Sequence, residues 1–294
     1  VDQLDLRLVD FSADVGAALT ALLRRNSKLT TLGLTAHKDE NLGDDSEVVP
    51  DDRSPGMTEK SLGDLITFLE MQPGNLRVLN LRGQTFAEAV ALPIATMLSK
   101  NSVLEELALD MCSLSPKAVQ CVTRGLHGNI ALTTLNLSGN EDLGVATAES
   151  FAEMLQKNST LTTLKFSAGA FDVEGWKLLA KGLRGNSSIQ LIHFAHGGAE
   201  LAEVLKWKDT KISSLYYYGP DVSDILQALE FNRTVLSLTL DCSCEGEVAE
   251  KLVGMLQKKT TLNSLTLNRC RISDGVATDA TTRKVVERLI KSTA

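Results

Sequence analysis

Two histidines and two cysteines are the side chains best suited to metal or redox chemistry: His193 and His196, and the pair in Cys242-Ser-Cys244. Imidazole and thiolate groups are the usual ligands of zinc, and the paired cysteines of a structural zinc site are normally at least two residues apart. Only one residue separates this pair, no second pair follows, and the histidines have no evident third ligand. We therefore predict no metal and no other cofactor.

Catalytic motifs are also missing from the chain. It contains no glycine-rich phosphate loop, no His-Glu-x-x-His and no Gly-x-Ser-x-Gly, which are the motifs that hold phosphates, catalytic zinc and a nucleophilic serine. In the repeat described below, no serine or cysteine nucleophile falls beside a histidine and an acid on one outward face. We expect a protein that is not an enzyme.

Aromatic side chains point to recognition instead. Tyr216-Tyr217-Tyr218 forms a short run about one repeat after His193. In a strand, Tyr217 takes the buried face while Tyr216 and Tyr218 share the opposite one. Aromatic rings exposed on a rigid sheet are favoured binding anchors, because they offer a large contact area at low entropic cost. A structural alternative stays open: tyrosine is a good strand former, and Trp207 or a folded-back loop would cover the two rings.

A repeat positions these residues. An apolar residue, two spacers, an apolar residue, one spacer and a third apolar residue recur along the chain, most clearly in Leu132-x-x-Leu135-x-Leu137. The frame starts at Val1, Leu29, Leu76, Leu104, Leu132, Leu161, Ile189, Ile212, Val235 and Leu262. The frame alternates like a half-buried strand, and a helical periodicity follows it, for example over residues 145–155. Strands joined by helices must be parallel, and a regular period of this size indicates a solenoid.

The register of the repeat predicts a stack of buried strand residues. Its members are Leu32, Leu34, Leu79, Leu81, Leu107, Leu109, Leu135, Leu137, Leu164, Phe166, Leu238, Leu240, Leu265 and Leu267.

The signature Leu-x-x-Leu-x-Leu-x-x-(Asn or Cys) is intact at Leu104 to Cys112, Leu132 to Asn140 and Leu262 to Cys270. With this signature and its 28- or 29-residue units, the chain resembles leucine-rich repeat proteins of the ribonuclease-inhibitor type. The resemblance covers essentially all of residues 1–294 and implies one α/β domain, a right-handed horseshoe-shaped solenoid with a concave parallel sheet and convex helices. The family includes inhibitors, immune sensors, GTPase activators, scaffolds and pathogen effectors, so the resemblance leaves the function open.

Charge and composition narrow the class of partner and the compartment. The formal net charge is −7, and no apolar run is long enough to span a bilayer, so we predict neither nucleic acid nor membrane as a partner. The five cysteines form no recognisable disulfide framework, which favours a reducing, cytoplasmic location. Because the strand frame begins at Val1 without a polar cap, we expect the chain to be a fragment of a longer protein.

The repeat breaks first between Leu29 and Leu76, where the interval exceeds one unit. The excess falls near residues 37–55 and contains Asp39, Glu40, Asp44, Asp45, Glu47, Asp51 and Asp52. The segment has too few apolar residues to bury itself, so we expect a mobile acidic loop. It is either a solvated insertion or an arm for a basic partner.

The repeat breaks again in two short units that start at Ile189 and Ile212. Their Asn/Cys position is Gly197 and Pro220, and their outward strand residues change from small and polar to aromatic. Because two irregularities coincide here, we predict that the concave surface of these units binds the partner. The predicted site residues are His193, His196, Tyr216 and Tyr218, with Lys165 and Asp241 at the rim.

These observations favour a non-catalytic scaffold or sensor module that binds another protein. One alternative is a GTPase-activating or other enzyme-regulating leucine-rich repeat protein. Another is a secreted effector or inhibitor, which the net acidity favours. No residue in the sequence identifies the partner.

Overall fold

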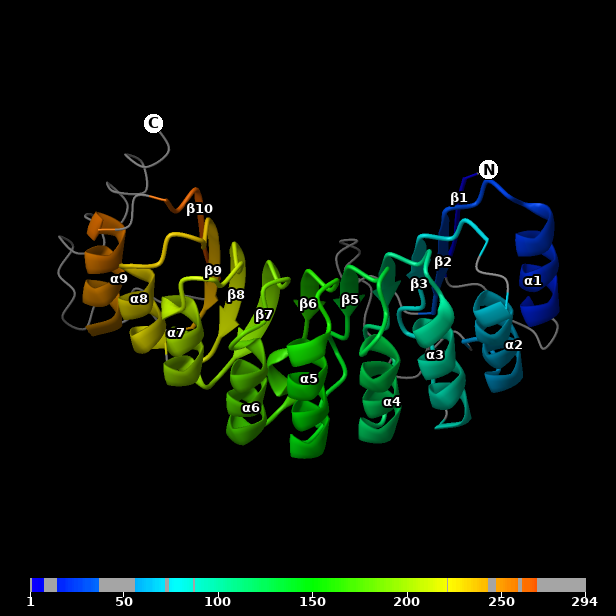
Figure 1. Ribbon diagram of the computed structural model, residues 1–294, viewed down its shortest axis with the longest axis horizontal. Coiled ribbons are helices and arrows are strands. Elements are labelled where there is room, and N and C mark those ends of the chain that lie inside the picture. The colour runs from blue at the N-terminus through cyan, green and yellow to red at the C-terminus, as the bar shows by residue number, and fades with distance from the viewer. Residues whose placement is uncertain are drawn as a thin grey trace, which may run out of the picture. The chain divides into compact units, whose positions relative to one another are not determined.

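The computed structural model describes residues 2–7, 15–36, 56–71, 74–86, 88–220, 222–242, 247–258 and 261–268. The acidic loop expected at residues 37–55 lies outside these ranges, as do Cys244 and Cys270. The chain forms two compact units, Val1–Leu143 and Gly144–Ala294. In each unit parallel strands alternate with helices, and the helices line one side of the sheet (Figure 1).

The first unit pairs its strands in sequence order, each parallel to the next. Its strands are β1 (Gln3–Arg7), β2 (Thr31–Thr35), β3 (Val78–Asn80), β4 (Glu106–Ala108) and β5 (Thr134–Asn136). Its helices are α1 (Val15–Arg25), α2 (Glu59–Met71), α3 (Glu88–Lys100) and α4 (Pro116–Leu126).

The second unit repeats this arrangement. Its strands are β6 (Thr163–Lys165), β7 (Leu191–Ala195), β8 (Ser214–Tyr218), β9 (Ser237–Asp241) and β10 (Ser264–Asn268). Its helices are α5 (Val145–Lys157), α6 (Val173–Leu183), α7 (Gly198–Lys206), α8 (Val222–Leu229) and α9 (Glu247–Lys258), with a short 3-10 turn, η1 (Ala168–Ala170), before α6.

The inward strand residues form the core that the repeat predicts. Leu79, Leu135 and Leu238 are fully buried, and so is every other residue of the predicted stack except two. Leu265 and Leu267 are only half-buried, and the prediction was wrong for them. They lie on β10, which pairs with β9 alone among the described strands, so one flank of each side chain lacks the strand neighbour that covers the other leucines.

Local sequence signals start several helices. Ser115 caps α4 by accepting a hydrogen bond from the N–H of Ala118, and Pro116 occupies the first turn. Asp172 caps α6 in the same way, through a 2.8 Å bond from the N–H of Gly175. Both caps satisfy backbone donors that have no partner within the helix, so the register of each helix is set at its first turn.

Buried asparagines link several of the helix-ending turns to the preceding repeat. Asn129 donates from Nδ2 to the carbonyl of Leu98 in the first unit, and Asn186 donates to the carbonyl of Leu155 in the second. The Oδ1 atom of each asparagine accepts from the backbone N–H groups that lead into the next strand. Each amide thereby satisfies backbone groups of two consecutive repeats, which fixes the spacing between them.

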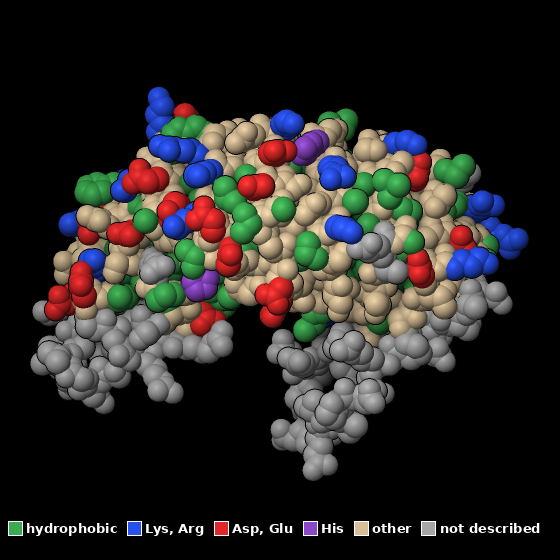
Figure 2. All heavy atoms as spheres, turned by 90° about the horizontal axis from the view of Figure 1, so that it is seen from below, with side chains coloured by type: hydrophobic (Ala, Val, Ile, Leu, Met, Phe, Trp, Pro, Cys, Tyr) green, Lys and Arg blue, Asp and Glu red, His purple; other side chains and the backbone are tan. Residues whose placement is uncertain are grey.

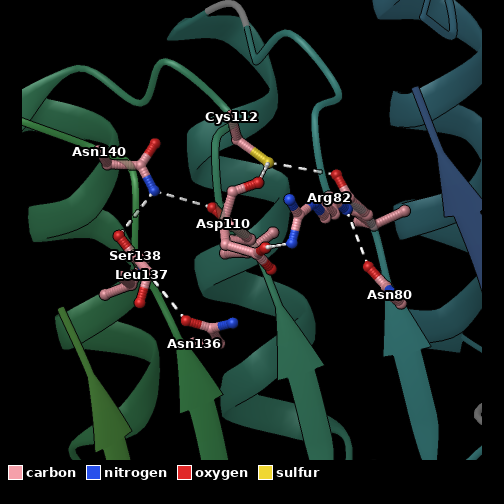
Figure 3. Close-up of polar contacts among 10 residues, drawn as sticks. Asn80, Arg82, Asp110, Cys112, Asn136, Leu137, Ser138 and Asn140 are labelled. Carbon is pink, nitrogen blue, oxygen red and sulfur yellow. Dashed lines mark hydrogen bonds and ion pairs between the residues drawn. The ribbon is translucent and has the colours of Figure 1, made fainter. Parts of the chain in front are cut away.

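A second ladder follows the strands of the first unit (Figure 3). Asn140 donates to the carbonyl of Leu109, the third apolar residue of the preceding repeat, and Cys112 makes the equivalent 3.1 Å contact with Leu81. Gln84 occupies the same repeat position and donates to the carbonyl of Leu34. The ladder therefore extends one repeat further than the Asn/Cys signature indicated, because a glutamine amide makes the same bond.

The two short repeats lose their residues where the sequence predicted, between strand and helix. Residues 196–197 connect β7 to α7 and residues 219–221 connect β8 to α8, whereas residues 109–115 connect β4 to α4. In return, β7 and β8 are five residues long and β4 is three. Strand pairing thus continues into positions that lie just past the strand in the β4 repeat, as it also does in β1 and β2.

Candidate functional site

The strand face of the second unit, which is the side of the sheet away from its helices, carries three neighbouring rings. His193 on β7 lies opposite Tyr216 on β8 in the parallel register, and Tyr218 follows on the same face. The ring centroids are 4.9 Å apart for His193 and Tyr216, and 4.6 Å apart for the stacked rings of Tyr216 and Tyr218. All three side chains are half-buried. We call His193, Tyr216 and Tyr218 the aromatic cluster.

The alternation expected for the tyrosine run is confirmed. Tyr217 is fully buried, with Leu215 on the same inward side of β8. Trp207, one of the two covers considered for the outward rings, lies at the C-terminal cap of α7. The outward rings pack on one another and on His193 instead.

Hydrogen bonds hold the three rings in place. Asn268 on β10 donates from Nδ2 to the hydroxyl of Tyr216 over 2.7 Å. The hydroxyl of Tyr218 lies 3.4 Å from Nδ1 of His193, and His193 also hydrogen-bonds the backbone of Phe166. Stacking and these bonds restrict the rotamers of the cluster before any partner arrives, which reduces the entropy lost on binding.

The aromatic cluster is electrically neutral near neutral pH. Burial, followed by the positive charge of Lys165, lowers the pKa of His193 from 6.5 to about 4, although the hydrogen bond to the Phe166 backbone opposes both effects. The imidazole therefore carries no charge in ordinary buffers. Its neutral form suits a packed aromatic surface better than an imidazolium ion would.

Lys165 and Asp241, the two predicted rim residues, flank the cluster on opposite sides. Lys165 ends β6, the strand next to β7, and Asp241 ends β9 directly opposite Tyr218. Both side chains are half-buried. Asp241 already has an interaction within the chain, whereas Lys165 forms no ion pair with any residue that the structure describes. The structure thus brings five of the six predicted site residues into one stretch of the sheet.

His196, the sixth predicted residue, lies in the turn that follows β7. Its backbone is left-handed, with φ of 51°, and its N–H donates to the carbonyl of Tyr218. Gly83, Gly139 and Gly219 hold the corresponding repeat position, also with positive φ. Histidine is one of the few non-glycine residues enriched in this conformation. Turn geometry is therefore a sufficient reason for His196, and an alignment of the repeats would have revealed it.

Asn268 is the residue that the sequence interpretation missed. It is separated from Tyr216 by two strand positions in the sheet and by 52 residues in the chain. The register pairs it with Asp241, which in turn lies opposite Tyr218. The repeat in the sequence indicated this register. It did not indicate that the side chain of Tyr216 is directed toward β10.

The strand face of the first unit is polar in the same places. Arg82 and Asp110 occupy the repeat position that Tyr218 holds in the second unit, and their side chains form an ion pair of 3.2 Å (Figure 3). Asp110 is 5% exposed. Outward residues on the neighbouring strands include Glu106, Asn80 and Thr134.

The described residues show little sign of reactive groups. They contain no group of three or more histidine, cysteine or acidic side chains placed to hold a metal ion. Burial, followed by the negative charge of Asp110, raises the pKa of the Cys112 thiol, which keeps it protonated. No helix within the described ranges is long and apolar enough to cross a membrane.

Figure 2 shows a different face of the molecule, on which acidic, basic and hydrophobic side chains are intermixed. The most exposed large apolar residues of the described chain are Ile130, Met71 and Phe231, and they belong to turns or helix ends of different repeats. Such scattered apolar side chains are normal on a protein surface. The aromatic cluster differs from them because its members touch one another.

Comparisons with known proteins agree with the repeat and the fold. No protein-family model matches the chain. The chain is 29% identical over 142 residues to leucine-rich repeat-containing protein 45 of Gallus gallus; the match covers 46% of this chain and 21% of that protein, so the chain spans about a fifth of the relative's length.

A solved structure, the leucine-rich repeat-containing protein LegL7 from Legionella pneumophila, matches 98% of this chain and 91% of its own. The TM-score is 0.54 and the sequence identity 15%, so this likeness concerns the fold alone. With the parallel strands, the alternating helices and the leucine frame, the chain has the α/β solenoid fold seen in leucine-rich repeat proteins.

Proposed function

We propose that this chain is a non-catalytic protein-interaction module and that it binds its partner on the strand face of the second unit. His193, Tyr216 and Tyr218 are the anchors, His196 lies at the edge, and Lys165 and Asp241 form the rim. The observation that carries the proposal is that the three rings are stacked and hydrogen-bonded to one another and to Asn268 while each stays half-exposed.

The energetics of interfaces support this choice. Interface hot spots are enriched in tyrosine and each contributes about 2 kcal/mol or more when truncated. Rings that are already ordered lose little rotamer entropy on binding, so more of the contact energy appears as affinity. Elsewhere on the described strands, the outward residues are mainly small, polar or charged and offer less contact area.

We also propose that the repeats form one continuous domain of the ribonuclease-inhibitor type that works in the cytoplasm. Full helices of 11 to 13 residues follow most strands of the first unit, as that type of repeat requires. Cys112 and Cys121 are free thiols, which suits a reducing compartment.

A double substitution tests the binding site. Proteins captured by the wild-type chain are identified, and their affinities are measured for a variant that carries Tyr216→Ala and Tyr218→Ala. We expect a loss of roughly a hundredfold or more, because two anchors are removed. The fold should survive, since both rings lie outside the leucine core.

The matched control carries Glu106→Ala and Thr134→Ala on the strand face of the first unit, where both residues are outward. This control should bind like wild type. Equal affinities for the tyrosine variant and the control would move the site away from the aromatic cluster. Circular dichroism and thermal melting of both variants must match wild type closely for the comparison to count.

A further inference from the structure

Lys165 is the charge on the strand face of the second unit that lacks a counterion within the described chain. Lys165 follows the pair Leu164 and Ile192 in the parallel register of β6 and β7, which places it on the strand next to His193. The other outward positions of β6 to β10 are uncharged, apart from Asp241, which interacts within the chain. The surface beside the cluster therefore offers one positive charge to a partner.

His193, the ionisable side chain on β7 beside Lys165, does not add a second positive charge. His193 is neutral near pH 7, since burial and Lys165 both lower its pKa. Lys165 itself is half-buried on the sheet, so part of its side chain lies against neighbouring residues. A carboxylate brought to this position would form a partly desolvated pair, which is stronger than a pair in open solvent.

The tyrosines offer apolar ring surface, and each hydroxyl already has one hydrogen-bonding neighbour within the chain. The hydroxyl of Tyr216 accepts from Asn268, and the hydroxyl of Tyr218 faces His193. A polar partner group at Tyr218 would compete with His193, whereas the hydroxyl of Tyr216 still has a proton to donate. An apolar or aromatic side chain instead packs on the ring faces without disturbing these hydrogen bonds.

Strand spacing sets the distance between the two features. Lys165 lies on β6 and the tyrosines lie on β8, with β7 between them. Two strand spacings amount to about 10 Å. In a partner, that distance corresponds to roughly three residues of extended chain or roughly seven residues of helix.

We infer that the partner presents a carboxylate to Lys165 and, about 10 Å away on the same segment, an apolar side chain to Tyr216 and Tyr218. The inference rests on the proposed function and specifies the chemistry of its partner. Charge complementarity at Lys165 provides orientation, and the ring contact provides most of the affinity.

A random-peptide display library, panned on the purified chain, provides the probe. Peptides enriched on wild type are expected to carry Asp or Glu three or seven residues from a large apolar residue. The same library is panned on Lys165→Glu, on the Tyr216→Ala and Tyr218→Ala double variant, and on Glu106→Lys as a control in the first unit. We expect Lys165→Glu to replace the acidic preference by Lys or Arg at that position, the double variant to lose enrichment, and the control to match wild type.

A double-mutant cycle then tests the interaction between Lys165 and the acidic residue of the peptide directly. For the most enriched peptide, replacement of its acid by the amide and Lys165→Met should each weaken binding about tenfold, and the two changes together should weaken it little further.

The outcomes separate the two proposals. Peptides that depend on the tyrosines but show no acidic preference, or that are unaffected by Lys165→Glu, overturn the inference and leave the proposed site intact. Peptides that bind the tyrosine double variant as well as wild type, or a library that yields no peptide preferring wild type over that variant, overturn both.

Discussion

The strand faces of the two units use one repeat position in two ways. In the β3 and β4 repeats of the first unit the position six residues after the first apolar residue lies just past the strand and holds Arg82 and Asp110, which form an ion pair. In the second unit the same position lies within a strand and holds Tyr218 and Asp241, which are paired in the sheet register. The connection to the next helix is long in the first case and short in the second.

The difference shows that, in these four repeats, a long connection accompanies an ion pair at this position and a shorter one accompanies a strand residue. Connection length alone does not set the length of the strand, because β1 and β2 are also five residues long and are followed by long connections. A long connection must satisfy its own backbone groups, and in the first unit the side chains of Gln84, Cys112 and Asn140 do so. A short connection has few such groups, so Gly197 and Pro220 suffice at the ladder position. The strand then gains an outward residue, and an aromatic ring at that place extends the surface.

The largest expected effect is a loss of stability when a core leucine, a feature of both units, is truncated. Leu135→Ala in the first unit and Leu238→Ala in the second remove fully buried side chains from equivalent core positions. Each should lower the free energy of unfolding by about 2–5 kcal/mol, through lost burial and the cavity left behind. Chemical denaturation measures both. A loss below about half a kcal/mol for either variant would show that the assumed register is wrong.

The next effect should appear only in the first unit. Asn140→Ala removes the amide that bonds the carbonyls of Leu109 and Leu137 and the N–H of Leu114. We expect a loss of about 2–3 kcal/mol, because buried backbone groups are left without partners. Urea denaturation measures this loss of stability. The control is Thr134→Ala, an outward substitution on β5, the strand that precedes the loop of Asn140. An unchanged midpoint would mean that water replaces the ladder at no energetic penalty.

A pH effect should appear only in the second unit. His193 has a pKa of about 4 in the folded chain and an ordinary pKa near 6.5 when unfolded. Its contribution to stability is therefore complete above pH 6.5 and is lost as the pH falls toward 4, because only the unfolded state gains the proton in that window. After allowance for its partial exposure, we expect about 1–2 kcal/mol.

A comparison of wild type with His193→Gln separates the contribution of His193 to stability from that of carboxylates that titrate in the same pH range. The stability difference between them should shift in favour of the variant as the pH falls from 6.5 to 4. Lys165→Met should raise the pKa of His193, as NMR of the imidazole would detect, because a neighbouring positive charge has been removed. A pKa near 6.5 in wild type would contradict the packed, neutral state of the cluster.

The smallest expected effect is on stability, and it concerns the left-handed residue that follows a strand in both units. His196→Gly and Met111→Gly each place glycine at a left-handed position. The strain relieved and the entropy gained by the unfolded chain nearly cancel, so the stability should change by less than about 1 kcal/mol. Thermal melting measures this change. A large loss of partner binding for His196→Gly, at unchanged stability, would instead make its imidazole part of the binding surface.

Sequence periodicity was sufficient for the inward and outward sense of nearly every strand residue. Tyr217 was predicted to be buried between two outward tyrosines, and it is. The reason is geometric: successive side chains of a strand point to opposite faces, and the leucine frame marks which face is the core. The same pattern overestimated the burial of Leu265 and Leu267, because a repeat states where a side chain points but not whether a neighbour follows it.

Tertiary structure alone decided which outward groups meet. Asn268 bonds Tyr216 across 52 residues, Tyr218 faces His193, and Arg82 pairs with Asp110. The repeat spacing places these residues on nearby strands, but it does not determine the contacts, since those depend on the rotamers of long side chains. The sequence determined a parallel leucine-rich solenoid with aromatic residues on its outward face. Packing between strands turned those residues into an ordered, uncharged cluster beside Lys165.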